Sequence, residues 1–271
     1  MLWSELVTAR PGSTAVDRAL AELVELREAL EEAATAPAVQ RLWEFCRTTT
    51  DAAVIRSVEA APQYHPLRKV LAARWAERLS HDEARTSRQA LAETGRTGLD
   101  GTSMLAVEGY RGIRGELELL RGRSVEQCAV LGCGPYPETL MALQASGLVR
   151  RRAVGVDRDE DTATLAAALV ERFCAPEPEV RVVHEDADAV DFAPYDLVVV
   201  ANGLLGKGRL MDRVHRTAPP GVRVLIRRPV LMGRLLYEHV EPRSRPGWAV
   251  AARHFGTPLS ETLLLERSDH P

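Results

Sequence analysis

The chain has 271 residues, a formal net charge of −3 and a pI near 6.2, and 45% of its residues are hydrophobic. This length can hold two modest domains or one large one. The charge gives no electrostatic reason to expect nucleic-acid or membrane binding, and no apolar run reaches membrane-spanning length. The N-terminus carries no basic segment followed by an apolar one, so we expect a cytoplasmic protein. Arginine supplies all 35 basic residues except Lys69 and Lys207, as is typical of a GC-rich bacterial genome.

Apolar residues recur at helical spacing in the first part of the chain. Prolines separate the helical stretches, and Ser80 opens a Ser-His-Asp-Glu run that predicts the N-cap of a further helix. We therefore predict an all-helical domain over residues 1–122. This domain would cover one end of a sheet, act as a lid over a substrate pocket, or do both. The expected helices are Val16–Ala33, Pro37–Arg47, Asp51–Ala61 and Leu67–Leu79.

The run CAVLGCGPYPETLMAL (Cys128–Leu143) predicts a buried strand, a tight glycine turn and an amphipathic helix. Glycines let the backbone of such a turn pass close to a ligand, and the helix that follows presents free N–H groups to it. This arrangement indicates a nucleotide-type cofactor site. Pro137 replaces the third glycine of the dinucleotide fingerprint, which favours a nucleoside without a pyrophosphate, such as S-adenosylmethionine. The expected cofactor-binding residues of the turn are Gly132, Gly134, Pro135 and Tyr136.

Three further cofactor contacts are expected where the next strands end. Asp157 ends an apolar strand, at the point where a carboxylate can hold the two ribose hydroxyls. Asp186 ends the following strand and could accept the exocyclic amine of adenine. Asn202 follows the apolar strand 195–202 and is expected beside the same pocket. The alternative, which stays open, is that the acids are solvated turn residues of an ordinary α/β domain.

Strands and helices alternate through the second half of the chain, with a fifth strand over residues 221–227. This alternation predicts parallel pairing with right-handed crossovers. The predicted fold class is therefore α/β, with a Rossmann-like S-adenosylmethionine-binding domain over residues 123–271 preceded by the helical domain. The helices expected after the first, second, fourth and fifth strands are Pro137–Ala145, Asp159–Phe173, Lys207–Arg216 and Val230–Val240.

The four cysteines are scattered along the chain, with neither a C-x-x-C pair nor a nearby pair of histidines. They predict no zinc site and no disulfide framework, so we expect no metal in the protein. Cys133 lies inside the glycine turn, where we interpret it as a small filling residue rather than a nucleophile. The cysteines are Cys46, Cys128, Cys133 and Cys174.

The last roughly 160 residues resemble the nicotianamine synthase family, including its bacterial relatives that make opine metallophores. Tyr110 and Glu116 precede a turn of the family's form G-x-G-P-x-P, in which the double proline is the most specific part. Arg227 and Gly233–Tyr237 are similar to the family's R-x-x-x-G-x-R-x-x-L-Y region, shortened by about two residues. The segment Gly247–Thr262 is similar to the family's closing hairpin.

The resemblance implies a reaction at the carbon chain of S-adenosylmethionine instead of its methyl group. The sulfonium activates all three attached carbons, so the position of the nucleophile decides which one reacts. An amine acceptor would take the 3-amino-3-carboxypropyl group, and methylthioadenosine (MTA) would be released. Glu116 is the implied general base, with Glu118 as the neighbouring alternative, and Tyr110 would orient the nucleophile. Burial under the helical domain would raise the pKa of Glu116 towards neutrality.

The substrate side of the site is expected at Glu138 and Arg227. Glu138 departs from the family, because some members have an aromatic or aliphatic residue at this position. An acid here could hold a cationic substrate, or it could favour the positive N-terminus of the following helix. The expected acceptor is a small amine or amino acid, in the biosynthesis of a metallophore or another natural product.

Three other functions stay open. The enzyme could close the cofactor's own amine onto its γ-carbon, which gives azetidine-2-carboxylate and needs no second substrate. It could be a small-molecule methyltransferase that releases S-adenosylhomocysteine, or a regulatory protein that only binds the cofactor. The oligomeric state stays open too, with a homodimer as one alternative. No nucleic acid or membrane is expected as a partner.

Overall fold

The computed structural model describes residues 14–32, 36–93, 112–242 and 247–267. These residues form two compact units. The helical unit contains the described residues up to Leu79 together with Pro229–Tyr237. The sheet unit contains the described residues of Ser80–Arg228 and those that follow Tyr237. Across the described ranges, no helix has both the length and the apolar composition that a membrane span requires.

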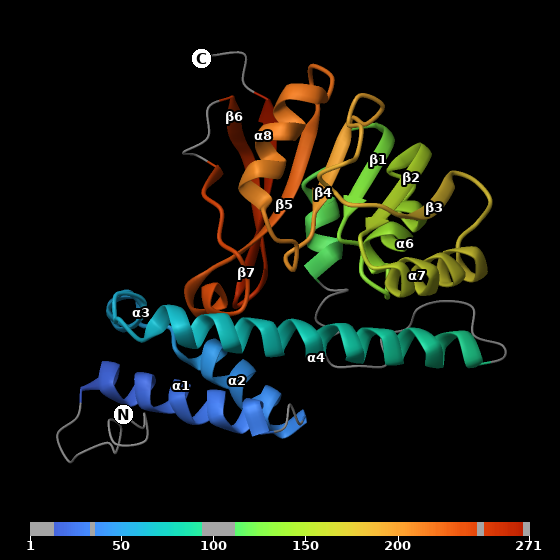
Figure 1. Cartoon of the computed structure of the whole chain (residues 1–271). Helices are drawn as coiled ribbons and strands as arrows, with labels where there is room; N and C mark the ends of the chain where they lie inside the picture. Colours follow the sequence, from blue (N-terminus) through green and yellow to red (C-terminus); the bar gives the residue numbers. More distant parts are fainter. Residues whose placement is uncertain (1–13, 33–35, 94–111, 243–246, 268–271) are drawn as a thin grey trace. The chain divides into compact units, whose positions relative to one another are not determined.

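Four helices supply most of the helical unit, and they agree with the helical periodicity of the sequence (Figure 1). They are α1 (Ala15–Glu32), α2 (Ala36–Thr48), α3 (Ala52–Glu59) and the first part of α4 (Tyr64–Ala92). Trp43 of α2 stacks on Trp75 of α4 with ring centroids 5.6 Å apart. Asp51 caps α3, because its carboxylate accepts hydrogen bonds from the N–H groups of Ala53 and Val54.

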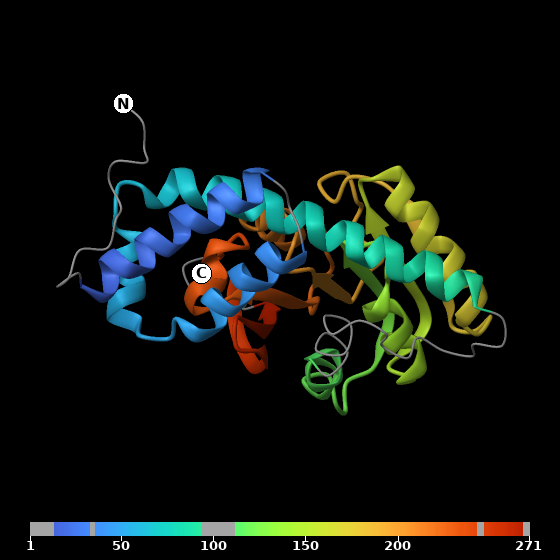
Figure 2. The same ribbon diagram turned by 90° about the horizontal axis from the view of Figure 1, so that it is seen from below.

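α4 is one uninterrupted helix where the sequence predicts two (Figures 1 and 2). Pro66 lies in its first turn, where the missing N–H is tolerated, and no proline or glycine follows before the helix ends. Ser80 is therefore an interior residue, and the N-cap predicted there is wrong. The second half of α4, from Ser80 on, belongs to the sheet unit. The compact units therefore differ from the predicted division into residues 1–122 and 123–271.

The sheet unit contains a seven-stranded sheet in the order β3-β2-β1-β4-β5-β7-β6. Its strands are β1 (Val125–Leu131), β2 (Val149–Asp157), β3 (Glu179–His184), β4 (Leu197–Val200), β5 (Arg223–Pro229), β6 (Trp248–Thr257) and β7 (Ser260–Arg267). The first five strands pair in parallel, whereas β6 and β7 form an antiparallel hairpin. The predicted α/β class, with a helical region before the sheet, is confirmed.

Both faces of the sheet are covered by apolar packing. The helices that follow β1, β2 and β4 are α6 (Glu138–Ala145), α7 (Glu160–Phe173) and α8 (Lys207–Thr217). Successive residues of a strand point to opposite faces. Ala129 and Leu131 of β1 accordingly pack in the cluster that includes α8, whereas Cys128 and Val130 pack in the cluster that includes α6. Burial on both faces explains why these strands read as continuous apolar runs.

The helix expected over Val230–Val240 does not form. A short 3-10 turn, η2 (Leu231–Leu235), replaces it, and Leu231 has a positive φ of 49°. The backbone carbonyls of Arg234 and Tyr237 instead accept hydrogen bonds from the guanidinium of Arg68 on α4, at 2.8 and 3.0 Å. Packing within the helical unit thus replaces the hydrogen bonds of a regular helix in this segment.

Candidate active site

The glycine turn between β1 and α6 has the conformation that only glycine adopts readily. Gly132 and Gly134 have φ values of 70° and 69°, in the left-handed region. The N–H of Gly132 donates to the carbonyl of Val156 at 2.9 Å, which fixes the turn beside the end of β2. A Cβ atom on Gly134 would lie 3.1 Å from Oε2 of Glu83. A side chain at Gly134 would therefore force the Glu83 carboxylate of α4 to shift slightly, in addition to requiring an unfavourable left-handed backbone.

Asp157 lies at the end of β2 and contacts the glycine turn directly. Its Oδ2 accepts a hydrogen bond from the N–H of Gly134 at 3.1 Å, and its Oδ1 accepts one from Asp159 at 3.2 Å. Both bonds orient the carboxylate at the carboxyl edge of the sheet, where a nucleoside would bind in this architecture. The side chain keeps some solvent access, so it has room for further hydrogen-bond partners.

Asp186 follows the end of β3, and Asn202 follows the end of β4. β3 pairs in parallel with β2, and β4 pairs in parallel with β1. Asp186 is exposed, and its Oδ1 accepts from the N–H of Asp188 at 2.8 Å. The side-chain oxygen of Asn202 accepts from Nζ of Lys207 at 3.3 Å. Both positions lie on the expected edge of the sheet, and their roles toward a cofactor stay predictions.

The second half of α4 is tied to the residues that follow the glycine turn. The hydroxyl of Ser87 donates to the carbonyl of Pro135 at 2.7 Å and is itself buried. Tyr136 is also buried, in a small apolar cluster with Ala90 of α4 and Leu169 of α7. Pro135 and Tyr136 thus anchor α4 beside the turn, and contact of either with a cofactor stays a prediction.

Glu83 is a site residue that the sequence did not identify. It lies one helical turn before Ser87, whose hydroxyl also donates to the Glu83 carbonyl at 2.9 Å. Burial, and then the nearby charge of Asp157, raises the pKa of Glu83 to about 7. No sequence motif separates this acid from the other acids of α4. Only the packing of the helix on the glycine turn distinguishes it.

Glu138, the first residue of α6, is the second carboxylate with a raised pKa. Burial, and then the negative charge of Glu83, raises the pKa of Glu138 to about 8, although Arg227 opposes this change. The hydrogen bonds and ion pairs of the described residues include none to the carboxylate of Glu83 or Glu138. Each carboxylate can therefore exchange a proton near neutral pH.

Glu116, in the helix of residues 112–118, is buried with 6% of its surface exposed. Its carboxylate accepts from Nε of Arg227 at 2.9 and 3.0 Å, from Nη2 of Arg227 at 2.6 Å, and from the hydroxyl of Thr262 at 2.6 Å. Burial by itself would raise the pKa of Glu116, but Arg227 and the hydrogen bonds outweigh it and lower the pKa. The expected raised pKa of Glu116 is therefore wrong, because no sequence pattern indicated that Arg227 would pair with it.

Arg227 of β5 is occupied mainly by groups of the protein itself. Besides Glu116, its Nη2 donates to the hydroxyl of Thr139 on α6 at 2.9 Å. This network links the helix before β1, the end of β5, and the helix after the glycine turn. The structure thus places Arg227 and Glu138 near each other, as their electrostatic interaction requires. Direct binding of a substrate by Arg227 stays a prediction.

Glu118 and Tyr110 were also predicted as catalytic residues. Glu118 lies outside the site, because its side chain is 60% exposed and pairs with Arg121. Tyr110 lies outside the described residues, so its expected role stays a prediction. The nearby glycines serve close packing: Gly112 approaches the backbone of Gly256, and a Cβ atom on Gly115 would collide with the ring of His254.

Lys207, the first residue of α8, is fully buried. Its Nζ donates to the side chain of Asn202 at 3.3 Å and to the carbonyls of Arg227 and Glu238 at 3.0 and 3.3 Å. Burial lowers the pKa of Lys207 to about 7, against the attraction of Glu238. This lysine fixes the backbone at the ends of β4 and β5. The scarcity of lysine in the chain was the only sequence signal for it.

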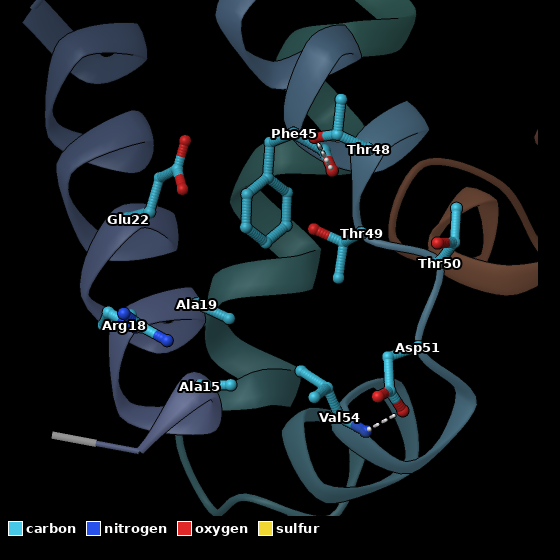
Figure 3. Close-up of a pocket in the computed structure, with 10 residues that line it drawn as sticks. All are labelled: Ala15, Arg18, Ala19, Glu22, Phe45, Thr48, Thr49, Thr50, Asp51 and Val54. Atoms are coloured by element: carbon cyan, nitrogen blue, oxygen red, sulfur yellow. Dashed lines mark hydrogen bonds between the residues drawn. The ribbon is translucent and has the colours of Figure 1, made fainter.

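A separate hollow of about 430 Å³ lies in the helical unit, between α1 and the residues that join α2 to α3 (Figure 3). Ala19 and Phe45 contribute apolar surface to it, and Thr48 and Asp51 contribute polar atoms that already bond to nearby backbone. It contains none of the predicted site residues. Among the residues that the structure describes, no three His, Cys, Asp or Glu side chains are grouped so that they could hold a metal ion.

The chain is similar in fold to solved structures of methyltransferases. Magnesium protoporphyrin IX methyltransferase (ChlM) from Synechocystis PCC 6803, with bound SAH, is similar with a TM-score of 0.52 and 15% identity. The match covers 74% of this chain and 99% of that one. Over the matched part, the chain thus has a fold like that of S-adenosylmethionine-dependent methyltransferases.

The similarity to structures of MtNAS covers more of the chain. MtNAS, a nicotianamine synthase, in complex with MTA and tNA has a TM-score of 0.72 and 17% identity, and the match covers 95% of this chain and all of that one. A glutamate-to-glutamine variant of MtNAS in complex with S-adenosylmethionine has a TM-score of 0.69 and 18% identity, with 91% and 96% covered. The predicted structural resemblance to this family is confirmed at the level of the fold. No family model and no curated protein matches the sequence.

Proposed function

We propose that this protein is an S-adenosylmethionine-dependent enzyme that transfers the 3-amino-3-carboxypropyl group to an amine of a small amino-acid-like acceptor and releases MTA. The observation that carries the proposal is the extent of the structural match. The match to MtNAS covers 95% of this chain, whereas the match to the ChlM methyltransferase covers 74%. The MtNAS similarity therefore extends over more of the chain than the shared cofactor-binding fold alone accounts for.

The glycine turn and the strand ends fit a nucleoside donor. Gly132 and Gly134 place no side chain at their two positions of the turn, and the carboxylate of Asp157 lies against it with solvent access. In this proposal Asp157 binds the ribose hydroxyls, and Asp186 and Asn202 contact the adenine side of the pocket. The donor supplies an electrophilic carbon, activated by the positive charge of its sulfonium.

Glu83 is the general base of the proposed reaction, in place of Glu116. A base must be free to take a proton and must have a pKa near the working pH. Glu83 meets both conditions, whereas the carboxylate of Glu116 is occupied by Arg227 and Thr262. The acceptor amine forms a bond to the γ-carbon while the carbon–sulfur bond breaks. That electron pair goes to sulfur, which leaves neutral MTA, and the amine proton passes to Glu83.

Glu116 and Arg227 act in this scheme as positioning residues. Their buried pair connects the helix of residues 112–118 to β5, and the bond from Arg227 to Thr139 extends the connection to α6. The first turn of α6 also carries Glu138, so the pair fixes the backbone that presents this carboxylate. Tyr110 remains the proposed residue that orients the nucleophile. The product would belong to the biosynthesis of a metallophore or another natural product in the bacterial cytoplasm.

Two related reactions share this donor. Cyclisation to azetidine-2-carboxylate uses the same activated carbon and the same by-product. Methyl transfer is the second candidate function, because the chain also resembles the ChlM methyltransferase with bound SAH in fold. That reaction differs only in which carbon of the sulfonium meets the nucleophile.

The nucleoside by-product separates these reactions. The purified protein is incubated with S-adenosylmethionine, with and without a mixture of amino acids and diamines, and the nucleosides are identified by mass spectrometry. We expect MTA, formed faster when an acceptor is present. Acceptor-independent MTA together with azetidine-2-carboxylate would indicate cyclisation. S-adenosylhomocysteine as the main nucleoside would contradict the proposal in favour of methyl transfer.

A further inference from the structure

Lys207 is a buried lysine whose hydrogen-bond partners are all oxygens. Its Nζ donates to the carbonyl of Arg227 at 3.0 Å, and to the carbonyl of Glu238 and the side-chain oxygen of Asn202 at 3.3 Å each. The residue has no exposed surface. An ammonium group has three N–H donors and no acceptor. The three oxygens therefore match the three donors of Lys207.

The backbone around Lys207 fixes the position of its Nζ. Gly206, directly before it, has a φ of 75°, and its N–H donates to the carboxylate of Glu238 at 2.7 Å. Lys207 is the first residue of α8, and the Arg227 carbonyl belongs to β5. Two of the three oxygens around Nζ are thus backbone atoms. Asn202 supplies the third, and it is the only one of the three that belongs to a side chain.

The lysine determines which way the amide of Asn202 turns. The oxygen and nitrogen of an amide side chain have similar shapes, so their partners decide the orientation. An ammonium only donates, and an amide NH2 next to it would leave both groups without an acceptor. Lys207 therefore holds the oxygen of Asn202 towards itself. The NH2 group, on the other branch of the amide, is directed away from Lys207.

This NH2 group is available at the edge of the sheet beside the glycine turn. Within the described ranges nothing accepts a hydrogen bond from it, and it is not fully buried. The preceding residue, Ala201, donates its N–H to the carbonyl of Leu131 at 3.1 Å, and a Cβ atom on Gly132 would lie 3.5 Å from the Cβ of Ala201. Asn202 thus follows a residue packed on the glycine turn, at the edge where a nucleoside would bind.

We propose that Lys207 is a positioning residue that holds the Asn202 amide with its oxygen inward, so that Asn202 donates a hydrogen bond to a ring nitrogen of adenine. This inference rests on the proposed function, because it gives Asn202 a defined role towards the nucleoside. A free asparagine could present either its oxygen or its NH2 group to a ligand. Lys207 leaves only the donor, which requires an acceptor such as the unprotonated N1, N3 or N7 of adenine.

The variant Asn202→Asp separates this role from a purely structural one. It keeps an oxygen for Lys207 and almost the same shape, but its second branch is an oxygen that cannot donate. If Lys207 and Asn202 only connected the strand ends, the variant would bind MTA as the parent does. We expect its affinity for MTA to fall by at least about tenfold. MTA has no net charge, so the added negative charge does not by itself explain such a loss.

The ligand atom is identified with analogues of MTA. The 1-deaza, 3-deaza and 7-deaza analogues each replace one ring nitrogen by C–H, and titration calorimetry gives their affinities for the full chain. We expect one analogue to bind the parent at least about fivefold more weakly than MTA does. In Asn202→Ala this penalty should fall below about twofold, because the donor is gone. The titrations are made at pH 6, where Lys207 is mainly protonated, since burial lowers its pKa only to about 7.

The role of Lys207 is tested by Lys207→Met, which removes the charge and frees the amide of Asn202. The deaza penalty should again fall below about twofold, whereas Lys69→Met, at an exposed lysine of α4, should keep it. Urea denaturation of Asn202→Asp tests the contact without substituting the lysine. A carboxylate beside an ammonium should leave the midpoint equal to that of the parent or raise it.

Several results would overturn the inference. They are full MTA affinity in Asn202→Asp, no penalty for any deaza analogue, a penalty that survives Asn202→Ala or Lys207→Met, a lowered midpoint in Asn202→Asp, and no MTA binding by the parent. The nucleoside by-product tests the proposed function separately. S-adenosylhomocysteine would refute the chain transfer, but the deaza penalty and its dependence on Asn202 would persist, because both by-products contain adenine.

Discussion

Two glutamates of the sheet unit, Glu83 on α4 and Glu116 in the helix of residues 112–118, have pKa values that are shifted in opposite directions. Glu116, from residues 112–118, pairs with Arg227 and has a lowered pKa. Glu83, from α4, has no such partner among the residues that the structure describes, and its pKa is raised to about 7. Desolvation raises the pKa of both carboxylates, so it does not explain why their pKa values are shifted in opposite directions. The presence or absence of a cationic partner determines which carboxylate can accept a proton at neutral pH.

The largest expected effect concerns the unpaired carboxylate. Glu83→Gln removes the proton acceptor and should lower turnover by about 10²–10⁴-fold, with little change in S-adenosylmethionine affinity. In the parent protein the rate should rise with pH through about 7, as Glu83 ionises, and this rise should disappear in the variant. Initial rates of MTA formation between pH 5.5 and 9 measure both effects. Glu77→Gln, at an exposed position of the same helix, is the control, and a full rate in Glu83→Gln would refute the assignment.

The paired carboxylate should instead affect stability. Glu116→Gln leaves the buried guanidinium of Arg227 without its counter-charge, and breaking such a pair typically costs about 3–5 kcal/mol in the free energy of unfolding. Urea denaturation of the parent, Glu116→Gln and the exposed control Glu118→Gln measures the difference. The control should remain within about 0.5 kcal/mol of the parent. If Glu116→Gln were as stable as the parent and had lost only its turnover, Glu116 would be the base after all.

Asp157 is a different case, since backbone N–H groups donate to it and no cation pairs with it within the described ranges. Asp157→Ala should remove two charge-assisted hydrogen bonds to the ribose, each of which contributes about 1.5–3 kcal/mol. We expect the affinity for S-adenosylmethionine to fall by at least about tenfold while the circular dichroism spectrum is retained. Equilibrium dialysis with labelled S-adenosylmethionine measures the dissociation constant. An unchanged constant would remove Asp157 from the cofactor site.

The smallest expected effect is the pH dependence of stability that Glu138 causes. Because its folded pKa is raised to about 8 from 4.5, the folded state binds more protons than the unfolded state between these values. The free energy of unfolding should therefore fall as pH rises through this range. Glu138→Gln cannot ionise, so its stability relative to the parent should increase as pH rises from 4 to 8.5. A stability difference that is equal at both pH values would contradict the raised pKa.

The periodicities of the sequence are local, and they predicted the local structure well. Continuous apolar runs predicted β1 and β4 because these strands are buried on both faces, as the two core clusters confirm. The glycine turn was predictable for a similar reason, since Gly132 and Gly134 occupy left-handed conformations that other residues avoid. Val230–Val240 is the exception. Its apolar spacing is helical, but hydrogen bonds from Arg68 to its carbonyls replaced the helix.

The sequence by itself therefore determined the α/β class, the order of the strands along the chain, and the acids at the edge of the sheet. Only the tertiary structure decided which acids are paired. Arg227 lies 111 residues from Glu116 in the chain, and Glu83 reaches the glycine turn because α4 continues past Ser80 and Ser87 binds Pro135. No local pattern encodes such contacts. A carboxylate's pKa depends on the charges within a few ångströms of it, and folding brings those charges together from distant parts of the chain.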